Sequence, residues 1–181
     1  MKPVLTGQFL IASKKLLDPT FAHAVVLIVR HDGDGAFGFV VNKPTGVTMA
    51  AALQGVLDEA ADLLAPVYNG GPCEGPAFVA HTDPSIGGEQ PTPGVFVTTD
   101  RDALRLLILT DSQPIKLFAT YSGWSPGQLE AELNEGSWHV SPAVANDIFE
   151  IDNTLWQRLT NRAQLSQYIN PNRIPDDPTV N

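Results

Sequence analysis

The chain has 181 residues, of which 43% are hydrophobic and 17% charged, so a single globular domain can bury a continuous core without a metal or a disulfide. Lysine and arginine number 11 against 20 aspartates and glutamates, and the net charge of −9 disfavours nucleic acids and anionic membranes as partners, because both select a basic surface. Cys73 is the single cysteine, which excludes an intrachain disulfide. With no secretory signal and no bilayer-spanning apolar run, these features predict a cytosolic protein.

The first half of the chain is predicted to be short strands separated by turns. Apolar runs indicate extended structure at residues 7–12, 24–29, 36–41, 66–68 and 77–81. The glycine-rich residues 31–35 join the second and third of these runs as a hairpin. Residues 42–46 are predicted to form a loop, because a proline moves the residue before it away from helical geometry, and Thr48 is placed to cap a helix that extends to residue 57.

The second half alternates strands and helices more regularly. Residues 82–93 combine prolines, glycines and charges without periodicity, which predicts a surface loop. A strand at residues 94–98 precedes a helix from residue 101 to about residue 110, which Asp100 caps and whose apolar face includes Leu104 and Leu107.

The best-defined local pattern is residues 115–133, a strand followed by a tight turn and an amphipathic helix. Further along, residues 137–140 are predicted to be extended and residues 142–149 to be a short helix. A last helix is predicted to start at Thr154, with Leu155 and Leu159 on its buried side. Three prolines make residues 170–181 an irregular tail.

Because strands alternate with helices only in part, the sequence favours a mixed sheet over a doubly wound parallel one. The predicted fold is a single α/β domain of α+β character, with a hairpin-rich N-terminal half and flanking helices. We place this domain at residues 1–169, followed by the tail at 170–181.

Residues 123–127, GWSPG, match the nucleophile-elbow pattern G-x-S-x-G between a strand and a helix. The oxyanion hole of that motif uses the backbone N–H of the residue after the serine, and here that residue is Pro126, which has none. A structural interpretation accounts for the same residues: Ser125 is the N-cap, Pro126 the first helical residue, and Gln128 completes a capping box. We therefore predict a cap at Ser125 and no catalytic residues.

Other motifs fail on their context. Residues 33–38 match G-x-G-x-x-G but precede a strand, so they offer no helix N-terminus to a pyrophosphate. Asp32 and Asp34 suggest a calcium loop, yet its twelfth position is Lys43, where glutamate is needed. The histidines are scattered and form no zinc motif. We expect no cofactor and no metal, and Cys73, after a glycine-rich turn, remains an alternative as a reactive thiol.

Taken together, these segments resemble the YqgE/AlgH family of bacterial proteins. The matching pieces cover almost the whole chain in order: GQFLIA at residue 7, LDPTF at residue 17, GAFGFVVNKP ending at residue 44, GGP at residue 70, YSGWSPGQLEAEL at residue 121, Trp138, the spacing of Ile148, Phe149 and Trp156, and PDDP at residue 175. The resemblance implies a single α/β domain with a mixed sheet, located in the cytosol. Some members carry the label of transcriptional regulator, which the acidic charge and the lack of a basic helix-turn-helix disfavour here.

We expect the turn-rich segments that match the family to frame one cleft. Its candidate residues are Asn42, Pro44, Gly70, Gly71, Pro72, Cys73, Trp124, Ser125, Gly127 and Gln128. The main hypothesis is a non-enzymatic binding or regulatory module, whose unknown small-molecule or protein partner meets the free N–H groups of the helix start. The alternatives are a small hydrolase that uses Ser125 and a thiol enzyme that uses Cys73. The sequence does not determine the oligomeric state.

Overall fold

The computed structural model describes residues 4–112 and 114–168, with side chains as far as residue 165. Within these residues ten strands form one sheet. They are β1 (Gln8–Ala12), β2 (Val25–Asp32), β3 (Gly35–Val40), β4 (Pro44–Thr48), β5 (Pro66–Tyr68), β6 (Cys73–His81), β7 (Glu89–Thr92), β8 (Val95–Thr98), β9 (Ile115–Trp124) and β10 (Trp138–Pro142). The tail predicted at 170–181, and the domain boundary before it, lie outside the described residues.

The main path of the sheet runs β10-β1-β2-β3-β9-β6-β8-β7, while β4 pairs with β5, and β5 with β9. The β5–β9 pairing is parallel and the other pairings are antiparallel. The predicted mixed sheet is therefore confirmed, and so is the hairpin between β2 and β3 in the N-terminal half.

Five α-helices flank the sheet in the described part of the chain. They are α1 (Met49–Leu53), α2 (Arg101–Leu109), α3 (Gln128–Asn134), α4 (Ala145–Phe149) and α5 (Leu155–Tyr168), with a 3₁₀ turn, η1, at Asp58–Ala60. Two predicted caps are present: Thr48 accepts the N–H of Ala51, and the Asp100 side chain accepts the N–H of Asp102. None of the described helices is long and apolar enough to span a bilayer.

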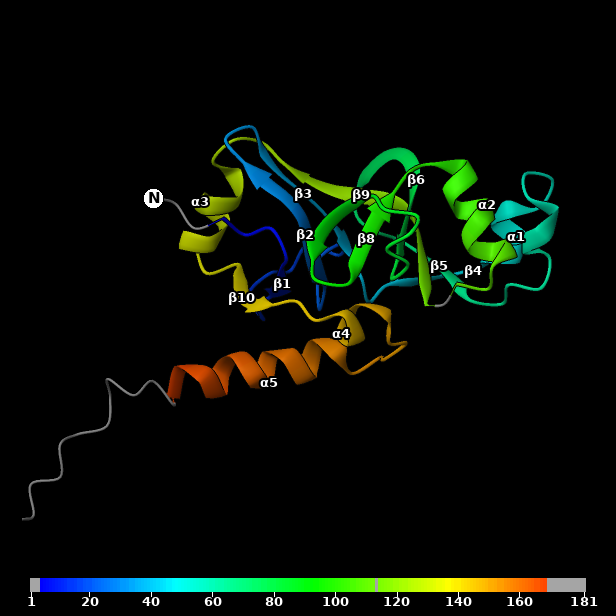
Figure 1. The fold of residues 1–181 in the computed structure, drawn as a ribbon. Coiled ribbons are helices and arrows are strands. Elements are labelled where there is room, and N and C mark those ends of the chain that lie inside the picture. The colour runs from blue at the N-terminus through cyan, green and yellow to red at the C-terminus, as the bar shows by residue number, and fades with distance from the viewer. Residues whose placement is uncertain (1–3, 113, 169–181) are drawn as a thin grey trace, which may run out of the picture.

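Both faces of the sheet are covered, so its central strands are continuously apolar. Along β2, Leu27 packs into one buried cluster, which α4 and α5 complete with Ile148, Leu155 and Leu159. The adjacent Val26 packs into a second cluster, beneath α3. A third cluster lies under α1 and α2. In Figure 1, α1 and α2 gather at one end of the molecule, α3 lies at the other, and α5 runs along the lower side.

The sheet curls so that its edge strand β7 returns toward β2. Arg30 on β2 forms an ion pair with Glu89 on β7, with 2.8 Å between Nη2 and Oε2. At the other end of β7, the Thr92 hydroxyl donates to the carbonyl oxygen of Ala143, which follows β10. Strands far apart in the sheet order therefore lie face to face across its concave side.

Four expectations about local structure were wrong in part. The loop predicted at 42–46 includes the start of β4, because Pro44 begins an edge strand that pairs irregularly with β5. The loop predicted at 82–93 contains β7, which pairs with β8. The helix after Thr48 ends at Leu53, four residues earlier than expected, and a 3₁₀ turn follows. The helix predicted at 142–149 begins only at Ala145, because Pro142 still belongs to β10.

Candidate functional site

Asn42, the first of the predicted cleft residues, forms hydrogen bonds to the backbone at the start of β2. Its Oδ1 accepts the N–H of Val25 at 2.9 Å, and its Nδ2 donates to the carbonyl oxygen of His23 at 2.9 Å. The next residue, Lys43, donates from Nζ to the carbonyl oxygens of residues 19 and 20. The NKP segment therefore contacts the LDPTF turn directly. These two segments, which both match the family, stabilise each other in the fold.

Gly70 and Gly71 cross between β3 and β9 where those strands separate. The Gly70 carbonyl oxygen accepts the N–H of Val40 at 2.8 Å and the hydroxyl of Ser122 at 2.9 Å. A Cβ on Gly70 would overlap the carbonyl oxygen of Thr120, and one on Gly71 would overlap the Ser122 hydroxyl. Both glycines are required by close backbone approach, so neither needs a ligand to account for it.

Trp124 is a buried, hydrogen-bonded part of the fold that also borders a small cavity of about 220 Å³. Its indole N–H donates to Oε2 of Glu132 at 2.9 Å, and the indole N–H of Trp138 donates to the same oxygen at 2.8 Å. Gln128 donates to the other carboxylate oxygen. The Phe21 ring contacts both indoles. Glu132 therefore anchors both tryptophans, and its two carboxylate oxygens are both engaged.

The turn before α3 differs from the predicted cap. The helix begins at Gln128, its N-cap is Gly127 in a left-handed conformation with φ of +78°, and that cap makes no side-chain hydrogen bond. The Ser125 carbonyl oxygen accepts the N–H of Gln128, while the Gln128 side chain accepts the N–H of Ser125 at 3.1 Å. The prediction of Ser125 as N-cap was wrong because Gly127 adds a left-handed turn. Only the Gln128 half of the capping box forms.

Cys73 begins β6 opposite Tyr121, and its Sγ faces the open side of Gly123. The structure therefore brings the Gly70–Cys73 segment beside the end of β9. Pro44 and Pro72 are exposed, and Asn42 is turned toward the β2 backbone instead. Whether the ten predicted residues act as one ligand site stays a prediction.

A cavity of about 560 Å³ borders the turn before α3, and we call it the His31 cavity. It is lined by Val4, His31, Asp32, Gly33, Pro126, Gly127 and Glu130. The buried His31 accepts the N–H of Leu5 at Nδ1, so its proton is assigned to Nε2, which lies 3.7 Å from Oε1 of Glu130. Because the carboxylates of Asp32 and Glu130 line this cavity, an anionic partner at the start of α3 would meet electrostatic repulsion here.

A second cavity, of about 540 Å³, lies on the concave side of the sheet, and we call it the aromatic cavity. It is lined by Arg30, Phe37, Pro76, Phe78, Gly88, Glu89, Val97, Thr98, Thr99 and Tyr121. The rings of Phe37, Phe78 and Tyr121 come from the adjacent strands β3, β6 and β9, and their centroids lie 5.2 to 5.9 Å apart. All three side chains are half-buried, so they form a floor with open ring surface.

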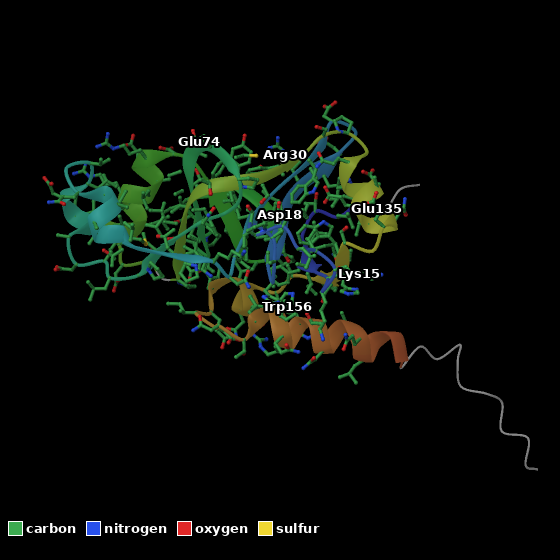
Figure 2. All side chains as sticks on the ribbon, turned by 180° about the vertical axis from the view of Figure 1, so that it is seen from behind. Lys15, Asp18, Arg30, Glu74, Glu135 and Trp156 are labelled. Atoms are coloured by element: carbon green, nitrogen blue, oxygen red, sulfur yellow. The ribbon has the colours of Figure 1, made fainter. Side chains whose placement is uncertain are left out.

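Arg30 and Glu89 stand at the rim of this cavity. Nε of Arg30 donates to Oε1 of Glu89 at 3.0 Å, and Nη2 donates to Oε2 at 2.8 Å, which is a two-point fork. The Glu89 carboxylate raises the pKa of the Arg30 guanidinium. In Figure 2, Arg30 lies toward the side of the molecule away from α5, where Trp156 faces the body of the domain.

Lys116 is the most perturbed ionisable group that the structure describes. Its side chain is 3% exposed on β9, and Nζ donates to the carbonyl oxygens of Val41 at 2.8 Å and Ile148 at 2.7 Å. The Tyr68 ring lies 4.0 Å below it. Burial lowers the pKa of the ammonium to about 7. The lysine ties the end of β3 to α4 inside the core, away from both cavities.

The described residues contain no group of three or more His, Cys, Asp or Glu side chains arranged to hold a metal ion. The sequence-based prediction also missed the groups that define the aromatic cavity. Phe37 and Phe39 are two residues apart on β3, so the sequence already predicts that both rings lie on the same face of the strand. Sequence spacing gives no sign that Phe78 and Tyr121 join this face.

The curled mixed sheet with helices on both faces defines an α+β domain. A model of the AlgH-like family matches residues 9–167, and the chain belongs to this family. A UPF0301 protein of Chlorobaculum tepidum is 34% identical over 97% of this chain and 95% of its own, and one of Xanthomonas campestris is 39% identical over 81% of each. The family prediction is therefore confirmed.

Solved structures agree with the fold. The solution structure of AlgH from Pseudomonas aeruginosa superposes with a TM-score of 0.72 and 27% identity, covering 100% of this chain and 98% of that one. A crystal structure from Corynebacterium diphtheriae gives 0.69 with 21% identity, over 90% of this chain and 88% of that one, which supports the fold alone. The predicted fold class is thus confirmed.

Proposed function

We propose that the protein is a non-enzymatic, cytosolic binding module whose ligand site is the aromatic cavity. The observation that carries this proposal is the floor of three half-buried rings, from Phe37, Phe78 and Tyr121, in a hollow of about 540 Å³. A volume of this size suits a small organic ligand or one large side chain of a protein partner. Flat apolar groups gain from stacking on such rings in addition to the area that they bury.

The chemistry around the cavity supports binding over catalysis. Its described lining includes one acid and one base, Glu89 and Arg30, and these are paired with each other. Ser125 is exposed and does not line this cavity in the structure, and Gly127 beside it borders the His31 cavity instead. Acyl transfer requires a general base that activates a nucleophile, and the carboxylate in the described lining, Glu89, is already engaged by Arg30.

The proposal predicts saturable binding of a neutral aromatic compound. We expect 2-naphthalenemethanol to shift backbone amide signals around the cavity in a ¹H–¹⁵N NMR titration. Phe78→Ala should weaken its affinity about 3- to 10-fold, the effect of losing one ring contact. Phe78→Leu keeps apolar packing and serves as the second variant should the alanine form be poorly folded.

Phe96→Ala is the matched control. Phe96 is a half-buried aromatic residue on β8 that stacks on His81 and does not line the aromatic cavity. Its removal should leave the naphthalenemethanol affinity unchanged. If the wild-type protein shows no saturable shifts, or if Phe96→Ala weakens binding as much as both Phe78 variants, the aromatic cavity is not the site.

A further inference from the structure

The guanidinium of Arg30 has donors to spare at the rim of the aromatic cavity. An arginine side chain carries five N–H groups, and Glu89 accepts from two of them, through Nε and Nη2. The described part of the chain provides no hydrogen-bond acceptor for the three others, which lie on Nη1 and Nη2. These donors form the terminal edge of the guanidinium, a geometry that matches the two oxygens of a carboxylate.

Glu89 holds this edge in a defined orientation. Its two-point contact fixes the plane of the guanidinium, so less side-chain freedom is lost when another group binds. The Arg30 side chain is 61% exposed, so a ligand can reach it from solvent. The Arg30–Glu89 pair bridges β2 and β7 directly above a cavity whose floor is aromatic. A cationic edge and a ring-lined floor therefore adjoin in one site.

Resting on the proposed function, we propose that the ligand of the aromatic cavity is a small aromatic carboxylate. Its ring lies on Phe37, Phe78 and Tyr121, and its carboxylate accepts from the terminal N–H groups of Arg30. Glu89 stays in place as the positioning partner of Arg30. The ligand bears the same charge as Glu89, so the guanidinium lies between two carboxylates, an arrangement that its five donors can satisfy.

The charges around the cavity discriminate against an amine in the same place. Glu89 is the one carboxylate in the described lining, and it already pairs with Arg30. Asp32 and Asp34 line a neighbouring cavity of about 220 Å³, which Arg30 and Phe37 also border. Within the described lining of the aromatic cavity, a cationic ligand would therefore face Arg30 and a carboxylate that is already paired, while Asp32, whose charge also acts on Arg30, lies outside that lining.

Three probes of equal shape test the ligand class: 2-naphthoate, 2-naphthalenemethanol and 2-naphthylmethylamine, titrated at pH 7 by NMR. We expect the anion to bind about 10-fold more tightly than the neutral alcohol, since a charge-assisted hydrogen-bonded pair contributes about this factor, and the protonated amine to bind most weakly. Arg30→Gln should reduce the ratio of anion to alcohol affinity to about one.

Arg105→Gln is the matched control, because Arg105 is a similarly exposed arginine that pairs with Glu59, and neither residue lines the aromatic cavity. It removes one positive charge from the chain and should leave the 10-fold ratio intact. An alcohol that binds the wild type as tightly as the naphthoate, or an amine that binds best, overturns the carboxylate proposal while the aromatic site stands. A ratio that survives Arg30→Gln also overturns it. If none of the probes binds, the proposed function itself is wrong.

Discussion

Lys116 shows how far a single residue departs from its usual behaviour in this fold. An ammonium is normally kept in water, yet this one is buried and uses carbonyl oxygens in place of a carboxylate. Carbonyl dipoles and the face of Tyr68 favour the charged form, while burial disfavours it. Burial dominates, because the pKa is lowered to about 7.

A consequence is that stability depends on the protonation of Lys116. The folded-state pKa of about 7 lies below the ordinary value of 10.5, so between these two pH values the unfolded chain binds the extra proton. The contribution of Lys116 to the free energy of unfolding therefore rises with pH across this window, by up to about 1.4 kcal/mol per pH unit. A ¹³Cε-lysine NMR titration should show one signal, absent in Lys116→Met, with a midpoint near 7.

Unfolding in urea checks the same prediction independently. The unfolding free energy of the wild type minus that of Lys116→Met should increase from pH 7 to pH 9. A Lys116 midpoint near 10, together with a difference that does not change with pH, would contradict the lowered pKa of this buried lysine.

Among the elements, α3 matters because it fastens two strands that follow each other in the chain but are separated by three strands in the sheet. One carboxylate oxygen of Glu132 accepts the indole N–H of Trp124 at the end of β9 and of Trp138 at the start of β10. Both indoles are buried, at 6% and 4% exposure. The family motif around α3 therefore has a structural explanation, the anchoring of two tryptophans by Glu132. It does not need the catalytic serine that the nucleophile-elbow pattern suggests.

Glu132→Ala leaves both indole N–H groups without their acceptor. Because an unpaired buried donor costs about 1–3 kcal/mol, we expect a loss of about 2–4 kcal/mol in the free energy of unfolding, measured in urea by tryptophan fluorescence. Glu135→Ala, an exposed glutamate at the end of the same helix, should change stability by less than about 0.5 kcal/mol. Equal stability losses in the two variants would show that the anchor contributes nothing.

The elements were largely predictable from sequence, whereas the cavity was not. The run of apolar residues in β2 and the caps at Thr48 and Asp100 are local signals, and these predictions were confirmed. The aromatic floor depends on β3, β9 and β6 being neighbours, an order that no spacing encodes. Arg30 and Glu89 are 59 residues apart and meet only because the sheet curls. Strand order and curl are properties of the whole sheet.

At the scale of the whole molecule, the curl divides the concave side into a filled part and an open part. Near α4 and α5 the space is occupied by core side chains that include Ile148, Leu155 and Leu159. Toward β7 and β8 the filling ends at the rings of Phe37 and Phe78, and the aromatic cavity begins. The long helix α5 lies along one side of the body in Figure 1. The binding proposal thus follows from the fold as a whole.

The location of a bound aromatic ligand tests this account most directly. With 2-naphthoate bound, we predict intermolecular nuclear Overhauser effects between the naphthyl protons and the ring protons of Phe37, Phe78 and Tyr121. Contacts confined to the His31 cavity, for example to Val4 and Pro126, would instead place the site at the start of α3 and contradict the account.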